Sequence, residues 1–238
     1  MRRQVSGFLA VALCVPLGSC ADKPMPKGNV TVFAATSLTG AFRDIGAAFE
    51  AANPGTKVTF NFAASSALAQ QISDGATPDV FASADTKSLR TGSVFARNRL
   101  VIVTKPGNPG RVKSLADLAH AGVISLCGAE VPCGLYAATA LAKAGVTLDE
   151  SGVTRAPNAA ATLTAVSEGD AVAGIVYATD AKAAGARVAT VAIPDGVNVL
   201  ASYPIATLRH TRAARAFVAL VRGRSGQRIL ERFGFIAP

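Results

Sequence analysis

The sequence is poor in the residue types that most often build metal sites or read nucleic acid. Its 238 residues include two histidines, four cysteines and no tryptophan, and aromatic side chains make up 6%. Few histidines and cysteines leave little material for a site that binds a metal cation. No run of lysine and arginine is interleaved with aromatic residues, so we do not expect nucleic acid as a partner.

Charged residues are also scarce, since they make up 16% of the chain against 50% for hydrophobic residues. This balance excludes a disordered chain and supplies enough apolar side chains for a large core. The formal net charge is nonetheless +9. Many of the arginines that produce it lie between Arg209 and Arg232, where a helical pattern predicts that they form a solvated helix face.

The motifs of common enzymes are missing as well. The sequence contains no G-x-S-x-G elbow, no GxGxxG fingerprint and no P-loop. Its two histidines, His120 and His210, lie in polar, loop-like contexts, so neither is placed to activate a serine. No pair of carboxylates flanks an obvious cleft. We therefore expect neither an enzyme nor a cofactor nor a metal-cation site.

The N-terminal segment has the pattern of a bacterial export signal. Two arginines precede an apolar stretch over 5–17, which is too short to span a bilayer. Small residues then lead to Cys20, as in a bacterial lipobox. We expect residues 1–19 to be a signal peptide, Cys20 to carry lipid at the extracytoplasmic face of the cell membrane, and residues 20–28 to form a tether. The alternative is an ordinary secretory signal with an incidental cysteine.

Export would place the mature chain in an oxidising compartment, where disulfides form and persist. With Cys14 inside the signal and Cys20 carrying lipid, Cys127 and Cys133 remain. The five residues between them include a glycine and a proline, and such a loop can return to disulfide distance. We predict a disulfide between Cys127 and Cys133. A metal site with a nearby histidine or glutamate, or two free buried thiols, are the alternatives.

Apolar strand patterns alternate with helical patterns from residue 30 onward. Strands are predicted at 30–35, 57–62, 80–84, 100–104, 123–127, 173–177, 187–193 and 203–208. Helices are predicted at 38–49, 65–75, 135–144, 159–168, 211–222 and 227–233, with a short one after Ser114. Short apolar strands alternating with helices indicate parallel sheets that helices cover on both faces, which is the α/β class.

Two of these strands lead through a serine into a helix, at Ser37 and Ser65. A hydroxyl at a helix start can cap the helix, and it lies beside backbone N–H groups that have no acceptor within the helix. Further N–H groups of this kind are expected around 133–134 and 158–161, and Tyr177 adds a hydroxyl. Because ligands bind beyond the carboxyl ends of parallel strands, these donors indicate a site for an oxyanion. Taken singly, each of these residues is an ordinary helix cap, turn or core-edge residue.

Several segments, in their order along the chain, resemble the molybdate-binding proteins of bacterial ABC importers. They are VFAATSL (32–38), FAASSALAQQI (62–72), PDVFASAD (78–85), VPCGLY (131–136), GIVYATDA (174–181) and RFGF (232–235). Each motif alone is weak, but the ordered set is specific, and the resemblance covers nearly all of residues 29–238.

The resemblance implies a two-lobed periplasmic binding protein fold, type II-like, in which each lobe is a mainly parallel sheet flanked by helices. The first lobe would comprise residues 29–104 and 203–238, and the second residues 105–202, with the ligand in the cleft between them. The family's molybdate contacts map onto Ser37, Ser65, Cys133, Ala161 and Tyr177. At positions 133 and 161 the contact is the backbone N–H, which any residue except proline supplies.

The resemblance also implies a function, which is high-affinity binding of molybdate or tungstate outside the cell membrane. The protein, expected to be a monomer, would deliver the anion to an ABC permease and its ATPase. No mapped contact is a carboxylate, so the proton of hydrogenphosphate would find no acceptor, whereas sulfate must be rejected by size. The alternatives are a binding protein for sulfate or another oxyanion, and a degenerate surface lipoprotein that binds nothing.

One stretch departs from the family pattern. Only residues 86–97 separate Asp85 from Asn98, and the family carries a longer segment there, normally a helix and a loop. We expect this helix of the first lobe to be shortened or missing. Its loss would uncover part of the sheet and loosen the fold.

Overall fold

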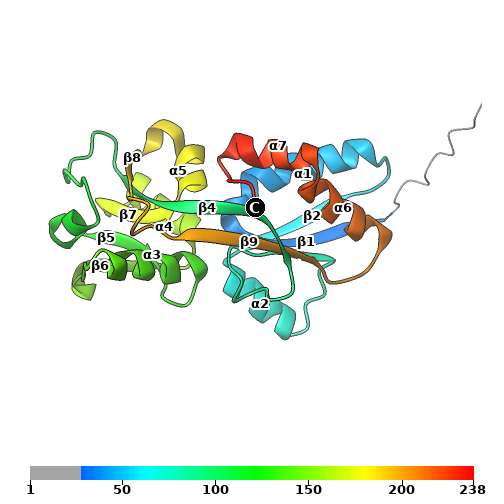
Figure 1. The fold of residues 1–238 in the computed structure, drawn as a ribbon, viewed down its shortest axis with the longest axis horizontal. Coiled ribbons are helices and arrows are strands. Elements are labelled where there is room, and N and C mark those ends of the chain that lie inside the picture. Colours follow the sequence, from blue (N-terminus) through cyan, green and yellow to red (C-terminus); the bar gives the residue numbers. More distant parts are fainter. Residues whose placement is uncertain (1–27) are drawn as a thin grey trace, which may run out of the picture.

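The computed structural model describes residues 28–238. The expected signal peptide, the lipidation site Cys20 and nearly all of the tether lie outside the described residues. The described chain is an elongated α/β structure in which two halves lie side by side, each with strands flanked by helices (Figure 1). The predicted fold class is confirmed. None of the described helices is both long enough and apolar enough to cross a bilayer.

One ladder of hydrogen-bonded strands runs through both halves in the order β2-β1-β3-β9-β4-β7-β5-β6, and β8 pairs with β4. The first half contains β1 (Val30–Ala35), β2 (Val58–Ala63) and β3 (Val80–Ala82). The second half contains β5 (Ile124–Cys127), β6 (Val153–Ala156), β7 (Ala173–Tyr177) and β8 (Ala189–Ala192). Strand β1 is parallel to β2 and β3, and β5 is parallel to β6 and β7, so the carboxyl ends of these strands share one edge in each half.

Two long strands, β4 (Ser93–Thr104) and β9 (Leu200–Thr207), connect the halves. Strand β4 pairs with β9 over Ser93–Arg99 and then with β7 over Leu100–Thr104. Strand β9 in turn pairs with β3 of the first half. The hydrogen bonding of β4 therefore passes from one half to the other at Arg99 and Leu100.

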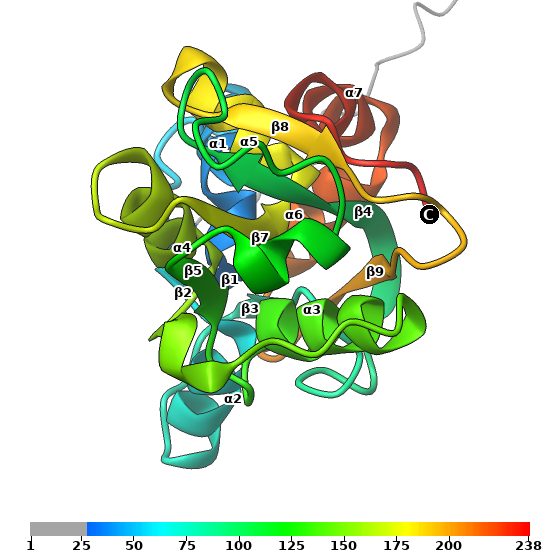
Figure 2. The same ribbon diagram turned by 90° about the vertical axis from the view of Figure 1, so that its left-hand side faces the viewer.

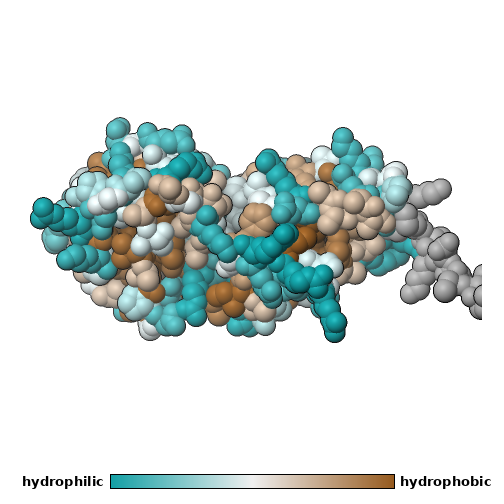
Figure 3. All heavy atoms as spheres, turned by 90° about the horizontal axis from the view of Figure 1, so that it is seen from above, coloured by the Kyte–Doolittle hydropathy of each residue, from teal (hydrophilic) through white to brown (hydrophobic). Residues whose placement is uncertain are grey.

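Helices cover both faces of each half (Figures 1 and 2). In the first half these are α1 (Thr39–Ala52), α6 (Arg212–Arg222) and α7 (Arg224–Phe233) on one face and α2 (Ser65–Ser73) on the other. In the second half they are α3 (Pro132–Lys143), α4 (Ala159–Ser167) and α5 (Ala178–Ala184). Phe42 of α1 lies against Phe95 of β4 and Phe217 of α6, with ring centroids 5.8 and 6.1 Å apart. Seen from above, hydrophilic side chains are spread over the outer surface of both halves (Figure 3).

Most strands and helices lie where the sequence predicts them, and β1 and β7 have the predicted bounds. Strand β4 is longer than the predicted 100–104, because Ser93–Arg99 pairs with the distant strand β9. Strand β6 and helix α5 were not predicted. Every residue of β6 is at least partly exposed, so the strand lacks the apolar run that would mark it in the sequence.

The shortened stretch after Asp85 contains no helix, as predicted, and β4 begins directly after Gly92. The expected uncovering of the sheet does not occur at this point. Leu89 is buried and packs with Phe33, Phe81 and Leu68, all of which are also buried. Leu89 and residues of α2 therefore cover the apolar cluster at this point of the sheet.

Candidate functional site

A small pocket lies where the two halves meet, at the carboxyl ends of β1, β2, β5 and β7. Its lining residues are Ala35, Thr36, Ser37, Ala63, Ala64, Ser65, Ala84, Val131, Pro132, Cys133, Asn158, Ala159 and Tyr177. Four of the five predicted contacts, Ser37, Ser65, Cys133 and Tyr177, are among them. The cavity has a volume of about 10 Å³, roughly the room that one water molecule needs, so the pocket in this arrangement is far smaller than sites for drug-sized organic ligands.

The two serines of the first half do not cap helices. Ser37 lies in a 3-10 turn (Thr36–Leu38) before α1, and its Oγ is 2.9 Å from the hydroxyl of Tyr203 on β9. Ser65 is the first residue of α2, and its Oγ accepts a hydrogen bond of 2.9 Å from the N–H of Ala84. The interpretation of these residues as ordinary N-caps is wrong. Both hydroxyls are instead held in place by other segments.

The helix starts around the pocket leave backbone N–H groups without intrahelical acceptors. In α2 the N–H of Leu68 bonds the carbonyl of Ala64, so the N–H of Ser65 precedes the first bond of this type. In α3 the N–H of Leu135 bonds the carbonyl of Val131, so the N–H of Cys133 likewise precedes it. These N–H groups carry the positive end of each helix dipole to the pocket, where a negative charge is favoured.

The start of α4 contributes Asn158 and Ala159 to the pocket wall. Asn158 caps this helix, as its alternative interpretation predicts, because its Oδ1 accepts a 2.9 Å hydrogen bond from the N–H of Ala161. Ala161 does not line the pocket, whereas Ala159 does. The sequence predicted correctly that a helix begins at Ala159. It did not show that the N–H of Ala161 already donates to the capping side chain of Asn158.

Tyr177 ends β7 and is 2% exposed. Its hydroxyl has no hydrogen-bond partner among the described residues, and burial raises the pKa of this phenol well above its ordinary value. A buried hydroxyl without a partner is costly, so its place in the wall of the pocket indicates that a ligand completes it. The interpretation of Tyr177 as a core-edge residue that caps a neighbour has no support in this arrangement.

A buried carboxylate lies behind Tyr177. Asp180 Oδ2 accepts a 3.3 Å hydrogen bond from the N–H of Tyr177 at the start of α5. Burial raises the pKa of Asp180 to about 7, and the hydrogen bond from Tyr177 opposes this shift only in part. Asp180 is not a lining residue, and none of the described lining residues is charged at neutral pH.

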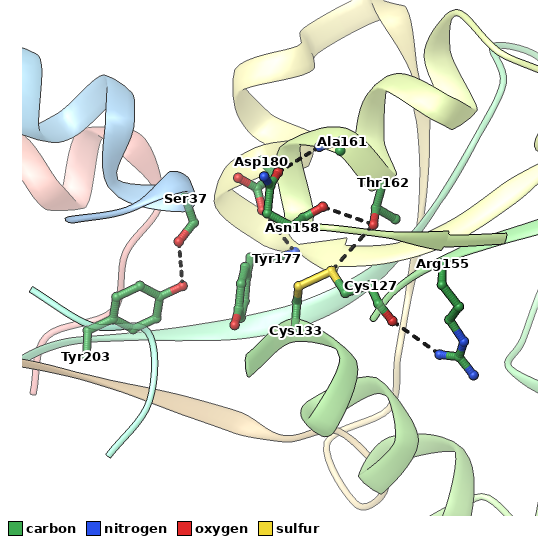
Figure 4. Close-up of a disulfide and its surroundings, with 10 residues drawn as sticks. All are labelled: Ser37, Cys127, Cys133, Arg155, Asn158, Ala161, Thr162, Tyr177, Asp180 and Tyr203. Carbon is green, nitrogen blue, oxygen red and sulfur yellow. Dashed lines mark hydrogen bonds between the residues drawn. A yellow bond between two sulfur atoms is a disulfide. The ribbon is translucent and has the colours of Figure 1, made fainter. Parts of the chain in front are cut away.

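A disulfide joins Cys127 at the end of β5 to Cys133 in the first turn of α3 (Figure 4). The two Cα atoms are 5.8 Å apart, and the predicted pairing is present. The loop is so tight that a Cβ at Gly134 would collide with the carbonyl oxygen of Gly128. The disulfide therefore ties the start of α3, with the N–H of Cys133, to the central strand of the second half.

Sequence reasoning missed the residues directly behind Ser37. Tyr203 on β9 is fully buried, and its hydroxyl also lies 3.4 Å from Nδ2 of the buried Asn98 on β4. Asn98 Nδ2 donates a second, shorter hydrogen bond of 2.8 Å to Thr179 Oγ1. Neither residue lines the pocket, and neither belongs to a recognisable motif, so the sequence offered no signal for them.

The site can thus surround a small anion with neutral donors. The donors are serine and tyrosine hydroxyls together with backbone N–H groups at helix starts, and no described lining residue is a carboxylate that could accept a proton from the ligand. No group of three or more histidine, cysteine, aspartate or glutamate side chains that could hold a metal ion occurs in residues 28–238.

Known proteins resemble this chain over nearly its whole length. The family model for bacterial extracellular solute-binding proteins matches residues 30–236. The molybdate-binding protein ModA of Mycobacterium tuberculosis (strain ATCC 25618 / H37Rv) is 39% identical over 248 residues, which cover 98% of this chain and 94% of that protein.

Two solved structures share the fold. The periplasmic molybdate-binding protein of Azotobacter vinelandii has a TM-score of 0.77 at 22% identity and covers 88% of this chain and 99% of its own. The sulfate-binding protein SubI from Mycobacterium tuberculosis H37Rv has a TM-score of 0.74 at 18% identity, with 87% of this chain and 86% of its own covered. Proteins named for two different anions thus have nearly equal TM-scores, so the fold alone does not select the anion.

Proposed function

We infer that this chain, which belongs to the bacterial extracellular solute-binding proteins, binds molybdate for delivery to an ABC importer. The observation that supports this function at the pocket is the buried Tyr177 hydroxyl, which has no partner among residues 28–238 and lies among helix starts. A fully deprotonated oxyanion accepts hydrogen bonds at every oxygen, so it satisfies such a set of donors. The family is extracytoplasmic, and we propose binding and delivery without catalysis.

We propose that the anion contacts Ser37, Ser65, Cys133 and Tyr177. The serines and the tyrosine would donate through their hydroxyls, and Cys133 through its N–H. For α4 we propose Ala159 in place of Ala161, because the N–H of Ala161 already donates to Asn158. Tungstate has the same shape and charge as molybdate, so we propose that it binds as well.

We further propose that residues 29–104 with 203–238 and residues 105–202 act as two lobes that close on the anion. The support is the pairing of β4 and β9, which cross between the halves side by side. Hinge motion about a few such residues is the usual closure of two-lobed binding proteins. Small-angle scattering with and without molybdate tests this, since an unchanged radius of gyration would contradict it.

Calorimetry of the purified protein with molybdate, tungstate, sulfate and hydrogenphosphate tests the function. We expect tight binding of the first two anions, and an absence of heat with molybdate would overturn the proposal. The matched variant is Tyr177→Phe. It should weaken molybdate binding about 10- to 100-fold, as loss of a hydrogen bond to a charged group does, without lowering the melting temperature of the free protein.

A second candidate is sulfate, which the structural similarity to a sulfate-binding protein favours. Sulfate also accepts hydrogen bonds only, and it is smaller than molybdate. Tight sulfate binding in the same calorimetric series, with weak molybdate binding, would select this alternative. A chain that binds no anion at all would show no thermal shift with any of the four.

The attachment of the protein is also a proposal. We propose that lipid on Cys20 anchors a monomer at the outer face of the cell membrane, beside the permease and its ATPase. The support is the lipobox-like sequence alone. Cells fed labelled palmitate should label the wild-type protein and not Cys20→Ala, and equal labelling would contradict the anchor.

A further inference from the structure

The net charge of the described chain comes entirely from its last thirty residues. Residues 28–208 contain thirteen lysines and arginines and thirteen aspartates and glutamates, so their formal charges cancel. Residues 209–238 contain seven arginines, no lysine and one acid, Glu231, which leaves a formal side-chain charge of +6. This charge is therefore confined to the segment that includes α6 and α7.

The arginines of both helices project away from the core. In α6, Arg212, Arg215 and Arg222 are exposed, whereas Phe217 and Val221 are fully buried. Spacings of three and seven residues place these three arginines on one side of the helix. The exposed arginines of α7 follow one another at spacings of four, and they are Arg224, Arg228 and Arg232. We call these six arginines the basic face.

The two helices that carry the basic face form one outer surface of the first half. They are joined at Gly223 and contact each other, and α1 lies beside both. Figure 3 views the molecule from this side, and hydrophilic side chains project from it where Figure 1 places α7.

The basic face has almost no counter-charge. Among the described residues, Arg232 is its only member with an ion pair, and its Nη2 is 3.7 Å from Oδ2 of Asp44 on α1. Arg215 donates to a backbone carbonyl and Arg228 to the hydroxyl of Ser225. Like charges that are kept together without counter-charges repel one another and lower stability. A polyanionic partner would remove this repulsion.

The basic face also lacks the apolar centre of a protein-binding site. The large hydrophobic side chains that are exposed on the described chain lie outside α6 and α7, and they are Val123, Leu200, Leu208 and Ile236. Protein interfaces are usually depleted of charge at their centre and depend on a few buried anchor residues. A sheet of anionic lipid headgroups needs no such fit, and its phosphates can accept bidentate hydrogen bonds from arginine.

The basic face lies near the point where the chain leads toward the proposed lipid anchor. Gly28 is exposed at the outer end of the first half, and β1, which begins two residues later, contacts α6 (Figure 1). Gly28 follows Cys20 by eight residues, which can span at most about 30 Å. An anchor of this length would keep the first half beside the bilayer, where attraction between charges acts over about 10 Å.

We propose that the basic face binds anionic membrane lipid and thereby holds the first half against the bilayer. The apolar sides of α6 and α7 are buried in the core, so neither helix can insert them between lipids, and the association is electrostatic. This inference is separate from the proposed molybdate binding, because no residue of the basic face lines the pocket.

Vesicle flotation tests the proposal with the mature chain from residue 21 onward, which lacks the cysteine that would carry lipid. At about 0.1 M salt we expect the protein to float with vesicles that contain phosphatidylglycerol and phosphatidylcholine in equal parts, but not with phosphatidylcholine alone. At about 1 M salt, where the Debye length falls to about 3 Å, binding should be lost. Equal binding to both kinds of vesicle, or binding that survives high salt, would overturn the proposal.

The test variant replaces four arginines of the basic face by glutamine, and they are Arg215, Arg222, Arg224 and Arg228. Each basic residue near an anionic surface raises the affinity about fivefold, so this variant should bind the anionic vesicles at least about 100-fold more weakly. All four side chains are exposed, so the melting temperature should not fall.

The matched control loses the same number of positive charges elsewhere on the surface. It replaces four other exposed residues by glutamine, and they are Lys87, Arg90, Arg111 and Lys113. Because charges far from the contact are screened by salt, its vesicle binding should stay within about threefold of the wild type. Equal losses in the two variants would show that net charge and not the basic face is responsible, which overturns the proposal.

A last measurement separates the membrane from the permease as the partner of the basic face. If the wild type binds the detergent-solubilised permease but not anionic vesicles, and the test variant loses that binding, the basic face belongs to the permease and the proposal is wrong. Calorimetry with molybdate on the same variants should give the wild-type Kd. A wild type that floats with anionic vesicles but binds no molybdate would refute the proposed function and leave this inference standing.

Discussion

The two walls of the pocket present hydrogen-bond donors in different ways. In the first half, Ser37 and Ser65 offer side-chain hydroxyls, each held by a hydrogen bond to a distant segment, and Ser65 adds its N–H at the start of α2. In the second half, Cys133 and Ala159 offer backbone N–H groups at helix starts, which a disulfide and the Asn158 cap hold in place. Tyr177 is the exception in the second wall, since its hydroxyl has no described partner.

The difference has a physical consequence. A backbone N–H is aimed by the helix that carries it, so its direction survives most side-chain changes. A hydroxyl can rotate, so its direction depends on a neighbour that takes up its other hydrogen bonds. Anion binding at the first wall should therefore depend on the serine side chains themselves. Anion binding at the second wall should depend on the disulfide and the Asn158 cap, which hold its helix starts. Two of the following three predictions test this contrast, and the other concerns the buried carboxylate behind the second wall.

The largest effect is expected from Ser37→Ala combined with Ser65→Ala. Each change removes a hydrogen bond to a charged ligand, worth roughly 1.5–3 kcal/mol, so molybdate binding should weaken about 100- to 10,000-fold. Calorimetry gives the Kd, and Ser66→Ala, which alters a neighbouring hydroxyl that does not line the pocket, is the matched control. If the double variant binds as tightly as the control, the first wall does not hold the anion.

The next effect concerns the buried carboxylate behind the second wall. The pKa of Asp180 is about 7 in the folded protein, which is raised above the ordinary value of about 4. Between these pH values the folded state holds more protons than the unfolded state, so the free energy of unfolding falls as pH rises from about 4 to about 7. It levels off above that range, and the full loss is on the order of 4 kcal/mol.

Asp180→Asn should remove this pH dependence and stabilise the protein at pH 8 relative to the wild type. Urea unfolding at pH 5 and pH 8 measures the change, and Asp170→Asn at an exposed aspartate is the control. A wild-type stability that rises between these pH values, with no effect of the substitution on that slope, would contradict the assignment to Asp180.

The smallest effect is expected from the disulfide. Cys127→Ser with Cys133→Ser keeps the N–H at position 133 but releases the start of α3 from β5. Closing so short a loop contributes about 2 kcal/mol to stability in the chain-entropy model, and a loosened N–H should weaken molybdate binding about tenfold.

Dithiothreitol treatment of the wild type should reproduce both changes, because it reduces the same bond. Thiol titration of the folded, unreduced protein tests whether the Cys127–Cys133 disulfide is present. Two reactive thiols in that titration would refute the disulfide, and unchanged molybdate binding after reduction would show that α3 needs no covalent anchor.

Much of the fold follows from local patterns. Strands β1 and β7 are apolar runs with the bounds that the sequence predicts, and the helix after β1 follows from the change of period, whereas helix α5 after β7 was not predicted. The Cys127–Cys133 pair was also predictable, because the other two cysteines are assigned to the signal peptide and to lipidation, and a short loop with glycine and proline can return to disulfide distance. What escaped prediction depends on pairing at long range, such as the extension of β4 against β9.

The sequence by itself determined which residues stand at the helix starts and that these starts follow strands. It could not decide what their hydroxyls do. A capping bond lies within three residues and is visible in the sequence, whereas Ser37 bonds Tyr203 at a separation of 166 residues and Tyr203 bonds Asn98 at 105. The pairing of β9 with β4 brings Tyr203 next to Asn98, and the turn after β1 places Ser37 beside Tyr203, so these hydrogen bonds are a property of the tertiary structure.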